Sequence, residues 1–374
     1  MKLNKDFNQM VRIKDVTRYL ESIAPLALQE SYDNAGLIVG DSNTEVTKVL
    51  VCLDSVEDTI DEAVRLGANL IVAHHPIVFS GLKRFNGSNY VERTVIKAIK
   101  NDIAIYAIHT NLDNVPNGVN SIIAKKLGLK NVRILSPKKK GLQKLVTFCP
   151  EASLESVKRA IYNAGSGEIG NYSNCSFSVS GTGTFKANND AQPFVGEIGE
   201  VHSENETRIE VVFPSHLQSQ VVNALRKAHP YEEVAYDVYS LENTNQYIGS
   251  GVIGEVENPT EILAFLREIK ETMKAGMVRY TNIKKTQLNT VAICGGSGSF
   301  LLSEAKKAGA DLFLTSDFKY HEFFDAENQI VIADIGHYES EQYTKELLAD
   351  FLRQKFSTFA VRISEINTNP VNYL

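Results

Sequence analysis

Two adjacent histidines, His74 and His75, point to metal chemistry in this chain of 374 residues. They follow the apolar run of residues 69–73 and precede Pro76, so both imidazoles lie where a strand is expected to end. Inside a regular strand, neighbouring side chains point to opposite faces. At a strand end, with Pro76 holding His75 extended, the two rings can diverge toward two nearby metal ions.

Three further residues complete a set of ligands: Asp113, His337 and Glu341. His337 and Glu341 share one face if their segment is helical, because they are four residues apart. Asp113 follows the apolar run of residues 103–108, where it is a ligand or caps the turn formed by residues 114–118. Three imidazoles and two carboxylates are too many for one open catalytic zinc, which usually keeps about three protein ligands. The set therefore predicts two metals bridged by Glu341 and by a water that becomes a nucleophile near neutral pH.

Mixed nitrogen and oxygen donors suit Zn, Fe, Mn, Co or Ni, and the sequence does not choose among them. Several neighbours keep two interpretations. His109 is a ligand or a partner that orients one. Residues 317–321 line a substrate pocket, where His321 is the candidate catalytic proton shuttle, or they cap a helix on a solvated face. Residues 295–299 form an anion cradle or, because the P-loop lysine is absent, a tight turn. Residues 32–37 reach the site or form a loop before a strand.

Alternating strands and helices must position these side chains. Residues 47–53, 69–73 and 103–108 have the apolar runs of buried strands, and residues 56–66 have the spacing of an amphipathic helix that Gly67 ends. This alternation predicts a parallel sheet covered on both faces. Open sheets of this kind bind ligands at the carboxyl ends of their strands.

The last part of the chain repeats this pattern. Residues 309–317 align with residues 67–75, and the strand 329–334 is followed by His337 much as the strand 103–108 is followed by His109. We therefore predict two related lobes with mainly parallel sheets, whose strand ends meet at one site.

The middle of the chain follows a different order of elements. Strand, helix, strands, helix and strand succeed one another there, which is a ferredoxin-like α+β order. The predicted class is α/β, with a first lobe at residues 1–137, an inserted domain at 138–248 and a second lobe at 249–374. Insertion is best tolerated at an exposed turn such as Ser136 and Pro137.

The composition of the chain limits which partners and which cellular compartment we expect. The net charge of −6 disfavours general nucleic-acid binding, and four scattered cysteines fit reduced thiols. No apolar run approaches the roughly 18 residues that cross a membrane. The first residues lack the apolar core of a signal peptide, so we expect a cytoplasmic protein without a membrane partner.

The chain resembles, over essentially its whole length, the Nif-three-like dinuclear metal proteins, often labelled GTP cyclohydrolase 1 type 2 homologs. The motifs that carry the resemblance are residues 33–37, 73–76, 109–113, 294–298, 315–321 and 336–341. It implies two divalent transition-metal ions per subunit, with zinc first among the candidates, on ligands His74, His75, Asp113, His337 and Glu341. The insert resembles the PII/CutA-like insert of the longer bacterial members through residues 165–172, 181–185 and 229–237. A ring-shaped homohexamer with interior metal sites is also implied.

Two classes of function follow. The first is a metal-dependent hydrolase that acts on a nucleotide-like substrate, either by opening the purine ring of GTP or as a phosphoesterase. The second is a non-enzymatic hexameric assembly that binds metal, nucleic acid or a small effector. The substrate and the identity of the metal do not follow from the sequence.

Overall fold

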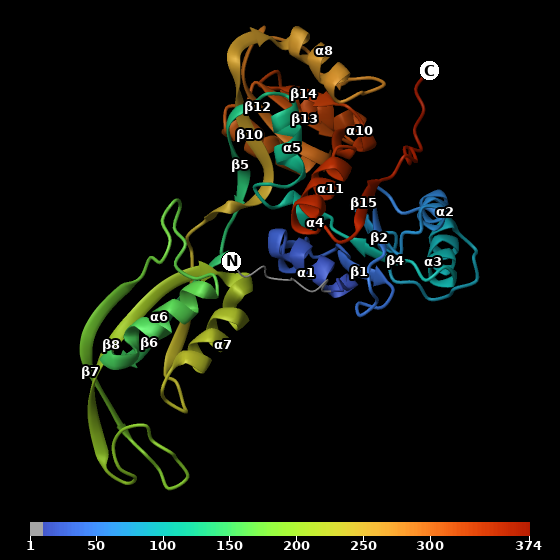
Figure 1. Cartoon of the computed structure of the whole chain (residues 1–374). Helices are drawn as coiled ribbons and strands as arrows, with labels where there is room; N and C mark the ends of the chain where they lie inside the picture. The colour runs from blue at the N-terminus through green and yellow to red at the C-terminus, as the bar shows by residue number, and fades with distance from the viewer. Residues whose placement is uncertain (1–9) are drawn as a thin grey trace, which may run out of the picture. The chain divides into compact units, whose positions relative to one another are not determined.

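The computed structural model describes residues 10–374 and divides into two compact units (Figure 1). The described part of Met1–Pro137 joins Tyr247–Leu374 in the first, here called the main unit. Lys138–Gln246 form the second, here called the insert. Among the described residues, no helix has both the length and the apolar character that crossing a membrane would require.

The first lobe of the main unit is a five-stranded sheet in the order β1-β4-β3-β2-β15. Its strands are β1 (Gly36–Val39), β2 (Lys48–Cys52), β3 (Leu70–Ala73), β4 (Ala104–Ala107) and β15 (Ala360–Ile363). All neighbours are parallel except β1, which runs antiparallel to β4. Successive side chains of β2 point to opposite faces of the sheet. Val49 and Val51 belong to the apolar core on one face, and Leu50 and Cys52 belong to the core on the other face.

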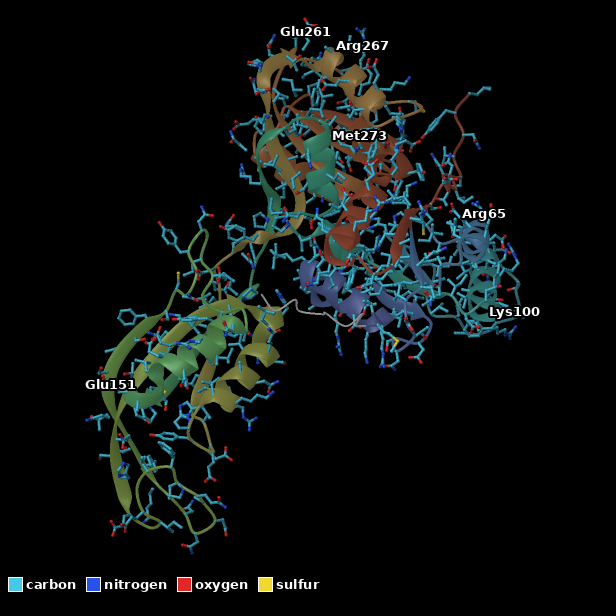
Figure 2. The ribbon with its side chains drawn as sticks, viewed as in Figure 1. Arg65, Lys100, Glu151, Glu261, Arg267 and Met273 are labelled. Carbon is cyan, nitrogen blue, oxygen red and sulfur yellow. The ribbon has the colours of Figure 1, made fainter. Side chains whose placement is uncertain are left out.

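Helices cover both faces of this sheet. The helices α2 (Glu57–Leu66) and α3 (Tyr90–Lys100) contact each other and place Ile60 and Val95 in one core. On the other face, α1 (Ile13–Ile23) contributes Ile13, Val16 and Leu20. Arg65 and Lys100 lie in the last turns of α2 and α3 and point outward (Figure 2). A basic side chain at this position stabilises the helix, because its positive charge interacts favourably with the negative end of the helix dipole.

The second lobe is a six-stranded sheet in the order β11-β14-β13-β12-β10-β5. Its strands are β5 (Lys130–Lys138), β10 (Asn245–Glu261), β11 (Arg279–Tyr280), β12 (Gln287–Ser297), β13 (Leu312–Ser316) and β14 (Val331–Asp334). The three parallel strands β12, β13 and β14 correspond to β2, β3 and β4, and each trio ends on a short antiparallel edge strand. The prediction of an α/β fold with two related lobes is confirmed.

One apolar core joins the two lobes. It contains Val49 and Leu70 from the first sheet together with Val291 and Leu314 from the second. The helices α5 (Val119–Lys126) and α11 (Thr344–Lys355) contact each other, and α5 contacts β12 while α11 contacts β2. The helix α8 (Ile262–Thr272) packs on the second lobe, with Met273 buried behind it and Arg267 exposed (Figure 2). The helix α9 (Leu302–Lys307) covers the opposite face of that sheet.

The insert contains β6 (Leu142–Pro150), α6 (Leu154–Asn163), β7 (Phe177–Lys186), β8 (Val201–Pro214), α7 (Gln218–Ala228) and β9 (Tyr236–Leu241). Its antiparallel sheet has the order β7-β8-β6-β9, the ferredoxin-like arrangement expected from the sequence. The two helices lie side by side on one face (Figure 1) and bury Leu145, Ile209 and Phe213 beneath them. The closer likeness to a PII or CutA domain stays a prediction.

Short helices follow the central strands of the main unit. The helix α4 (Thr110–Asp113) begins three residues after β4, and α10 (His337–Glu341) begins three residues after β14. Beyond β15 the chain returns to the same edge, where Thr368 and Asn369 contact residues that follow β2 and β14. The carboxyl ends of both sheets therefore meet where the predicted ligands lie.

Candidate metal centre

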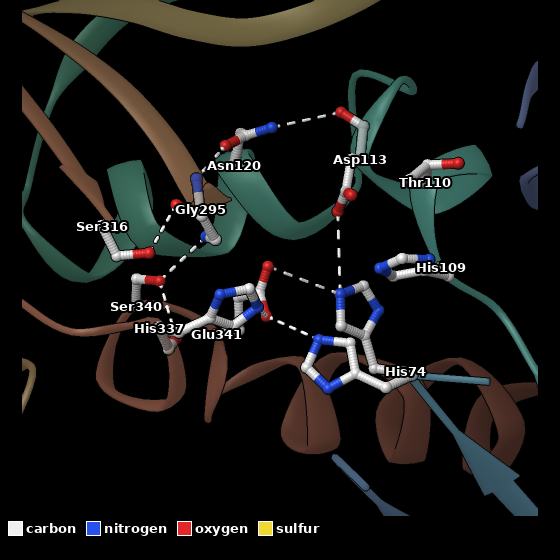
Figure 3. A network of polar contacts seen from close by, with 12 residues as sticks. His74, His109, Thr110, Asp113, Asn120, Gly295, Ser316, His337, Ser340 and Glu341 are labelled. Atoms are coloured by element: carbon white, nitrogen blue, oxygen red, sulfur yellow. Dashed lines mark hydrogen bonds and ion pairs between the residues drawn. The ribbon is translucent and has the colours of Figure 1, made fainter. Parts of the chain in front are cut away.

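All five residues predicted as metal ligands converge in the main unit (Figure 3). His74 and His75 follow β3, Asp113 is the last residue of α4, and His337 and Glu341 are the first and last residues of α10. Three overlapping groups have ligand atoms within 4.8 Å of one another: His74, His75 and His109; His75, His337 and Glu341; and His74, Asp113 and Glu341. Overlap of this kind provides for more than one ion.

His74 lies at the centre and is fully buried. Its Nδ1 donates to the carbonyl oxygen of Ile108 at 2.8 Å, which leaves Nε2 as the free nitrogen. That Nε2 lies 3.8 Å from Asp113 Oδ1 and 3.7 Å from Glu341 Oε1 (Figure 3). Two donors that each lie about 2.1 Å from one zinc ion are at most about 4.2 Å apart, so these separations suit a shared ion.

Two buried atoms of this group have no hydrogen bond. Among the described residues, nothing satisfies His74 Nε2 or Asp113 Oδ1. A buried polar atom without a partner costs free energy, and buried charges are normally paired or bound to a metal. The orphaned nitrogen and oxygen therefore fit a metal ion between them.

His75 is held from both sides. Its Nδ1 contacts Asp54 Oδ1 at 2.7 Å, and its Nε2 contacts Glu341 Oε2 at 3.0 Å. Thr368 Oγ1 donates to the other oxygen of Asp54 at 2.5 Å and so fixes the carboxylate. Asp54 was not among the predicted site residues, although its place at the carboxyl end of a neighbouring strand is a signal that could have identified it.

His337 repeats this arrangement in the second lobe. Its Nδ1 contacts Asp317 Oδ2 at 2.6 Å, and its Nε2 lies 3.1 Å from Glu341 Oε2. Asp317 has a φ of 61°, in the left-handed region, where aspartate is one of the better tolerated residues. The segment after β13 therefore supplies the residue that holds the His337 ring.

His109 is a fourth imidazole at the site. Its Nδ1 contacts Asp33 Oδ1 at 2.8 Å, and its ring centre lies 5.3 Å from those of His74 and His75. Asp33 also accepts a hydrogen bond from the backbone N–H of Thr110 at 3.0 Å. Of the two interpretations of residues 32–37, the contact of Asp33 favours a segment that reaches the site.

The four histidines share one pattern: an oxygen acceptor holds Nδ1 in each. The acceptors are the Ile108 carbonyl oxygen, Asp54, Asp33 and Asp317. Metal-bound histidines usually donate their other ring N–H in this way, which fixes the tautomer and the ring orientation. The pattern leaves the four Nε2 atoms for the centre of the cluster.

The glycine-rich turn 295–299 shapes the position of Glu341. Gly296 has a φ of 64°, and a Cβ there would lie 2.4 Å from Glu341 Oε1. The amide of Gly295 donates to Asn120 Oδ1, and the amide of Gly296 donates to Ser340 Oγ. Side chains use both of these amides, and the turn packs against Glu341, which favours the interpretation as a tight turn.

Electrostatics within the cluster set the two carboxylates apart. Burial alone would raise the pKa of Glu341, but His337, His74 and His75 lower it well below its usual range. Burial raises the pKa of Asp113, and the charge of Glu341 raises it further. Burial opposes the protonation of His75 and His337, yet their carboxylate partners raise the pKa of His75 to about 10 and that of His337 to about 11. Without a metal, protons supply the positive charge that the two carboxylates require.

The predicted catalytic residue His321 lies elsewhere. It belongs to the 3-10 helix Tyr320–Ala326, is exposed, and its ring contacts Tyr320 and Phe324. It is in none of the ligand groups found among the described residues. Asp317 thus reaches the site from residues 317–321, and a role for His321 stays a prediction.

A cavity of about 500 Å³ opens beside His337. Its walls come from the strand ends and from the C-terminal segment, and they include Asp54, Arg279, Tyr338, Asn369 and Tyr373. Arg279 pairs with the buried Asp334 and also donates to the carbonyl oxygen of Phe318. The cavity is large enough for a small molecule that reaches the cluster.

Known proteins resemble this chain over nearly its whole length. The family model described as Duf34/NIF3 (NGG1p interacting factor 3) matches residues 11–370. A Bacillus subtilis relative named GTP cyclohydrolase 1 type 2 homolog is 37% identical, with 96% of this chain and 98% of the relative covered. A crystal structure of a Bacillus cereus protein related to NIF3 has a TM-score of 0.85 and 36% identity, with 98% of this chain and 100% of that chain covered. A Staphylococcus aureus structure has a TM-score of 0.77 and 30% identity, with 98% and 99% covered.

Proposed function

Because the chain belongs to the DUF34/NIF3 family, we propose that it is a dinuclear metal-binding hydrolase that acts on a nucleotide-like substrate. One observation carries the proposal: four imidazoles, each oriented through Nδ1, surround two carboxylates of which Glu341 is buried and contacts three rings. The name of the curated relatives, GTP cyclohydrolase 1 type 2 homolog, supports the nucleotide class of substrate.

The proposed ligands are His74, His75, Asp113, His337 and Glu341, which would hold two divalent transition-metal ions per subunit. Zinc is the first candidate, and Fe, Mn, Co and Ni fit the same donors. Glu341 is the proposed bridge, because Oε1 faces His74 while Oε2 faces His75 and His337. When bound, such ions supply Lewis-acid chemistry and make water a nucleophile near neutral pH.

The carboxylates around the ligands have a positioning role. Asp54 and Asp317 hold the rings of His75 and His337, so each Nε2 is directed at Glu341 without reorganisation. The carbonyl oxygen of Ile108 does the same for His74. Fixed orientation of this kind raises the basicity of the ligand nitrogen and is worth about 10- to 100-fold in metal affinity.

His109 is the proposed group that moves a proton during turnover. Its partner Asp33 has a pKa lowered to about 2, because hydrogen bonds from His109 and Thr110 outweigh the effect of burial. The Asp33 carboxylate holds Nδ1 of His109 and so leaves Nε2 to exchange a proton with a substrate. His321 has no comparable position, because its ring contacts Tyr320 and Phe324.

The cavity beside His337 is the proposed substrate site. Among the described residues that line it, Arg279 carries the permanent positive charge, and its side chain is exposed. A guanidinium suits the phosphate of a nucleotide, although Asp334 already engages one of its nitrogens. Tyr338 and Tyr373 offer aromatic surface to a base.

The test is a hydrolysis screen across nucleotides and phosphodiesters with metal-loaded protein, chelated protein and reloaded protein. We expect an activity that disappears on chelation, returns on reloading and is lost in Glu341→Gln. Glu62→Gln is the control, since Glu62 is also buried, accepts hydrogen bonds from Ser364 and Glu365, and does not line the proposed substrate cavity. Among the described residues, it belongs to none of the ligand groups. An activity that survived both chelation and Glu341→Gln would contradict the proposal.

A second pair of variants tests the proton carrier. His109→Gln should keep the metal content and lower kcat, whereas His321→Gln should leave both unchanged. Loss of metal in His109→Gln would make this residue a ligand instead. If two ions bind and no substrate in the screen is turned over, the non-enzymatic metal-binding assembly becomes the better account.

The quaternary state is proposed on family resemblance. A homohexamer would elute as a particle of six chains in size-exclusion chromatography with light scattering, and a monomer or dimer would contradict it.

A further inference from the structure

Two glycines open a trough on the face of the insert sheet that α6 and α7 leave uncovered. On β8, Thr207 and Ile209 are buried on the helix side, so Glu206 and Arg208 between them face the other way. On the edge strand β7, Gly181 pairs with Glu206 and Val179 pairs with Arg208, so they share that open face. A Cβ at Gly181 would meet nothing within 4 Å, so this position is empty space.

The trough widens into a cavity of about 750 Å³. Aromatic side chains form much of its wall, and they come from β6, from β7 and from the segments after β7 and α7: Phe148, Phe185, Phe194 and Tyr231. The Tyr231 ring centre lies 6.2 Å from those of Phe185 and Phe194. Walls of this kind suit a flat apolar molecule, because rings pack on it by stacked or edge-on contacts.

Glu206 supplies the carboxylate of this cavity. It rests over Gly183, where a Cβ would lie 2.2 Å from Glu206 Oε2. Among the described residues, no lysine or arginine forms an ion pair with Glu206, and the nearby Arg208 is engaged by Glu210 at 2.8 Å. The carboxylate of Glu206 faces the Tyr231 hydroxyl and keeps further lone pairs as acceptors for a donor from outside the chain.

The hydroxyl of Tyr231 adds a second polar group to the wall. Its oxygen is buried, and no hydrogen bond of good geometry satisfies it among the described residues. Burial raises the pKa of Tyr231, and a hydrogen bond toward the Glu206 carboxylate raises it further, so the phenol keeps its proton and is directed at that carboxylate. Buried polar atoms of this kind are usually satisfied by a partner.

We propose that this cavity of the insert binds a small planar heteroaromatic molecule that carries paired N–H donors, with Glu206 as their acceptor and the aromatic side chains as its walls. A carboxylate accepts two parallel N–H bonds with good geometry, as it does from a guanidinium. Glu206, Glu232 and Glu233 line the cavity together with Lys186 and Arg208, and Glu210 already pairs with Arg208, so the balance of charge disfavours an anion such as phosphate.

This site shares no residue with the metal centre and lies in the other compact unit of the chain. It also gives a role to two sequence motifs that the metal centre leaves unused. The glycines belong to the motif at residues 181–185, and Tyr231 belongs to the motif at residues 229–237. The two motifs meet at this cavity.

Calorimetric titration of the full-length protein tests the proposal with a pair of probes. The first probe is 2-aminobenzimidazole, which has a ring N–H beside an amino group. The second is 2-methylbenzimidazole, of nearly the same shape but without the amino donors. We expect saturable binding of the first probe, one per chain, with the second bound about tenfold or more weakly because it leaves Glu206 without its paired donors.

Two variants locate the binding. Gly181→Val fills the trough without a steric clash and should abolish binding of the first probe, while Gly81→Val, also in open space, should leave binding unchanged. Glu206→Gln should bind both probes about equally. Unchanged metal content and circular dichroism would show that the variants are folded. Absence of saturable binding, full binding by Gly181→Val, or an unchanged preference in Glu206→Gln would overturn the proposal.

Discussion

The two lobes carry similar side chains at the carboxyl ends of one pair of corresponding strands, β4 and β14. Behind β4 and behind β14, each lobe places a histidine and, four residues later, a carboxylate: His109 with Asp113, and His337 with Glu341. In both pairs an aspartate holds Nδ1 of the histidine. The related lobes have therefore kept one arrangement of strand, short helix and side chains.

The lobes differ at the neighbouring pair of strands. Behind β3, His74 and His75 face the cluster, whereas the corresponding residues behind β13 are Ser316 and Asp317. Ser316 Oγ donates to the carbonyl oxygen of Gly296 at 2.6 Å, and Asp317 orients a ligand. At this strand end the first lobe thus contributes two imidazoles to the cluster, whereas the second contributes a hydroxyl and a carboxylate that hold neighbouring groups in place. The two related backbones therefore present different functional groups at corresponding positions.

The largest expected effect distinguishes His74 from its counterpart Ser316. His74→Ala removes the nitrogen between the two carboxylates, so metal affinity should fall by at least about 100-fold, beyond the range for orienting partners. Ser316→Ala removes one hydrogen bond to a turn and should keep two ions per chain. Metal titration of both variants checks this, and equal losses would contradict the assignment of ligand and support.

The next effect compares the orienting carboxylates of the two lobes. Asp54→Asn and Asp317→Asn each release one imidazole from its fixed orientation, so each should lower metal affinity about 10- to 100-fold. Asp58→Asn, on an exposed turn of α2, is the control. Competition with a chelator of known affinity measures the three variants. An unchanged metal affinity in both variants would show that these carboxylates do not position the ligands.

A smaller effect tests whether the two backbones are equivalent. Gly67 and Gly309 precede β3 and β13 at corresponding positions, with φ of 67° and 75°. At neither position would a Cβ meet an atom closer than 3.8 Å, so alanine adds conformational strain and little else. We expect each alanine variant to lose about 1 kcal/mol of unfolding free energy in urea. A loss confined to one lobe would contradict the equivalence.

The smallest effect depends on pH. Asn69 and Asp311 occupy corresponding positions, and each accepts hydrogen bonds from the start of the preceding strand. Burial alone would raise the pKa of Asp311, but Lys285 and two backbone N–H groups lower it. A lowered pKa stabilises the fold above the unfolded carboxyl pKa of about 3.9 and loses this contribution as the pH falls through the folded value.

Asp311→Asn therefore removes a pH-dependent contribution in the second lobe. The melting temperature of the wild type should fall more between pH 7 and about pH 3 than that of the variant. Asn69→Asp should introduce a dependence of the same sign in the first lobe. Parallel profiles for the wild type and Asp311→Asn would show that the Asp311 carboxylate has an ordinary pKa.

The fold and the convergence of the five proposed ligands were predictable because they depend on local patterns. Apolar runs place the strands, and parallel strands gather their carboxyl ends at one edge, so His74 and His337 had to approach each other. The spacing of four residues in α10 brought Glu341 to the same face as His337. These inferences need no knowledge of contacts between segments that are distant in the sequence.

The contacts of the supporting residues were not predictable, because they join distant segments, although the positions of Asp33, Asp54 and Asp317 near strand ends were visible in the sequence. Thr368, in the C-terminal segment beyond β15, donates a hydrogen bond to Asp54. No local sequence pattern predicts that this segment returns to the site. Asp33 meets His109 through the path of a loop. His321 was a candidate proton shuttle because it follows β13; it is exposed on the 3-10 helix that begins at Tyr320, and its role stays a prediction.

The central claim is that two lobes with unequal strand ends build one dinuclear centre. Its most direct test is the metal content of the purified full-length chain, measured by inductively coupled plasma mass spectrometry after dialysis against metal-free buffer. The account predicts two transition-metal ions per chain. A content of zero or one ion, also after reloading with excess zinc, would contradict it.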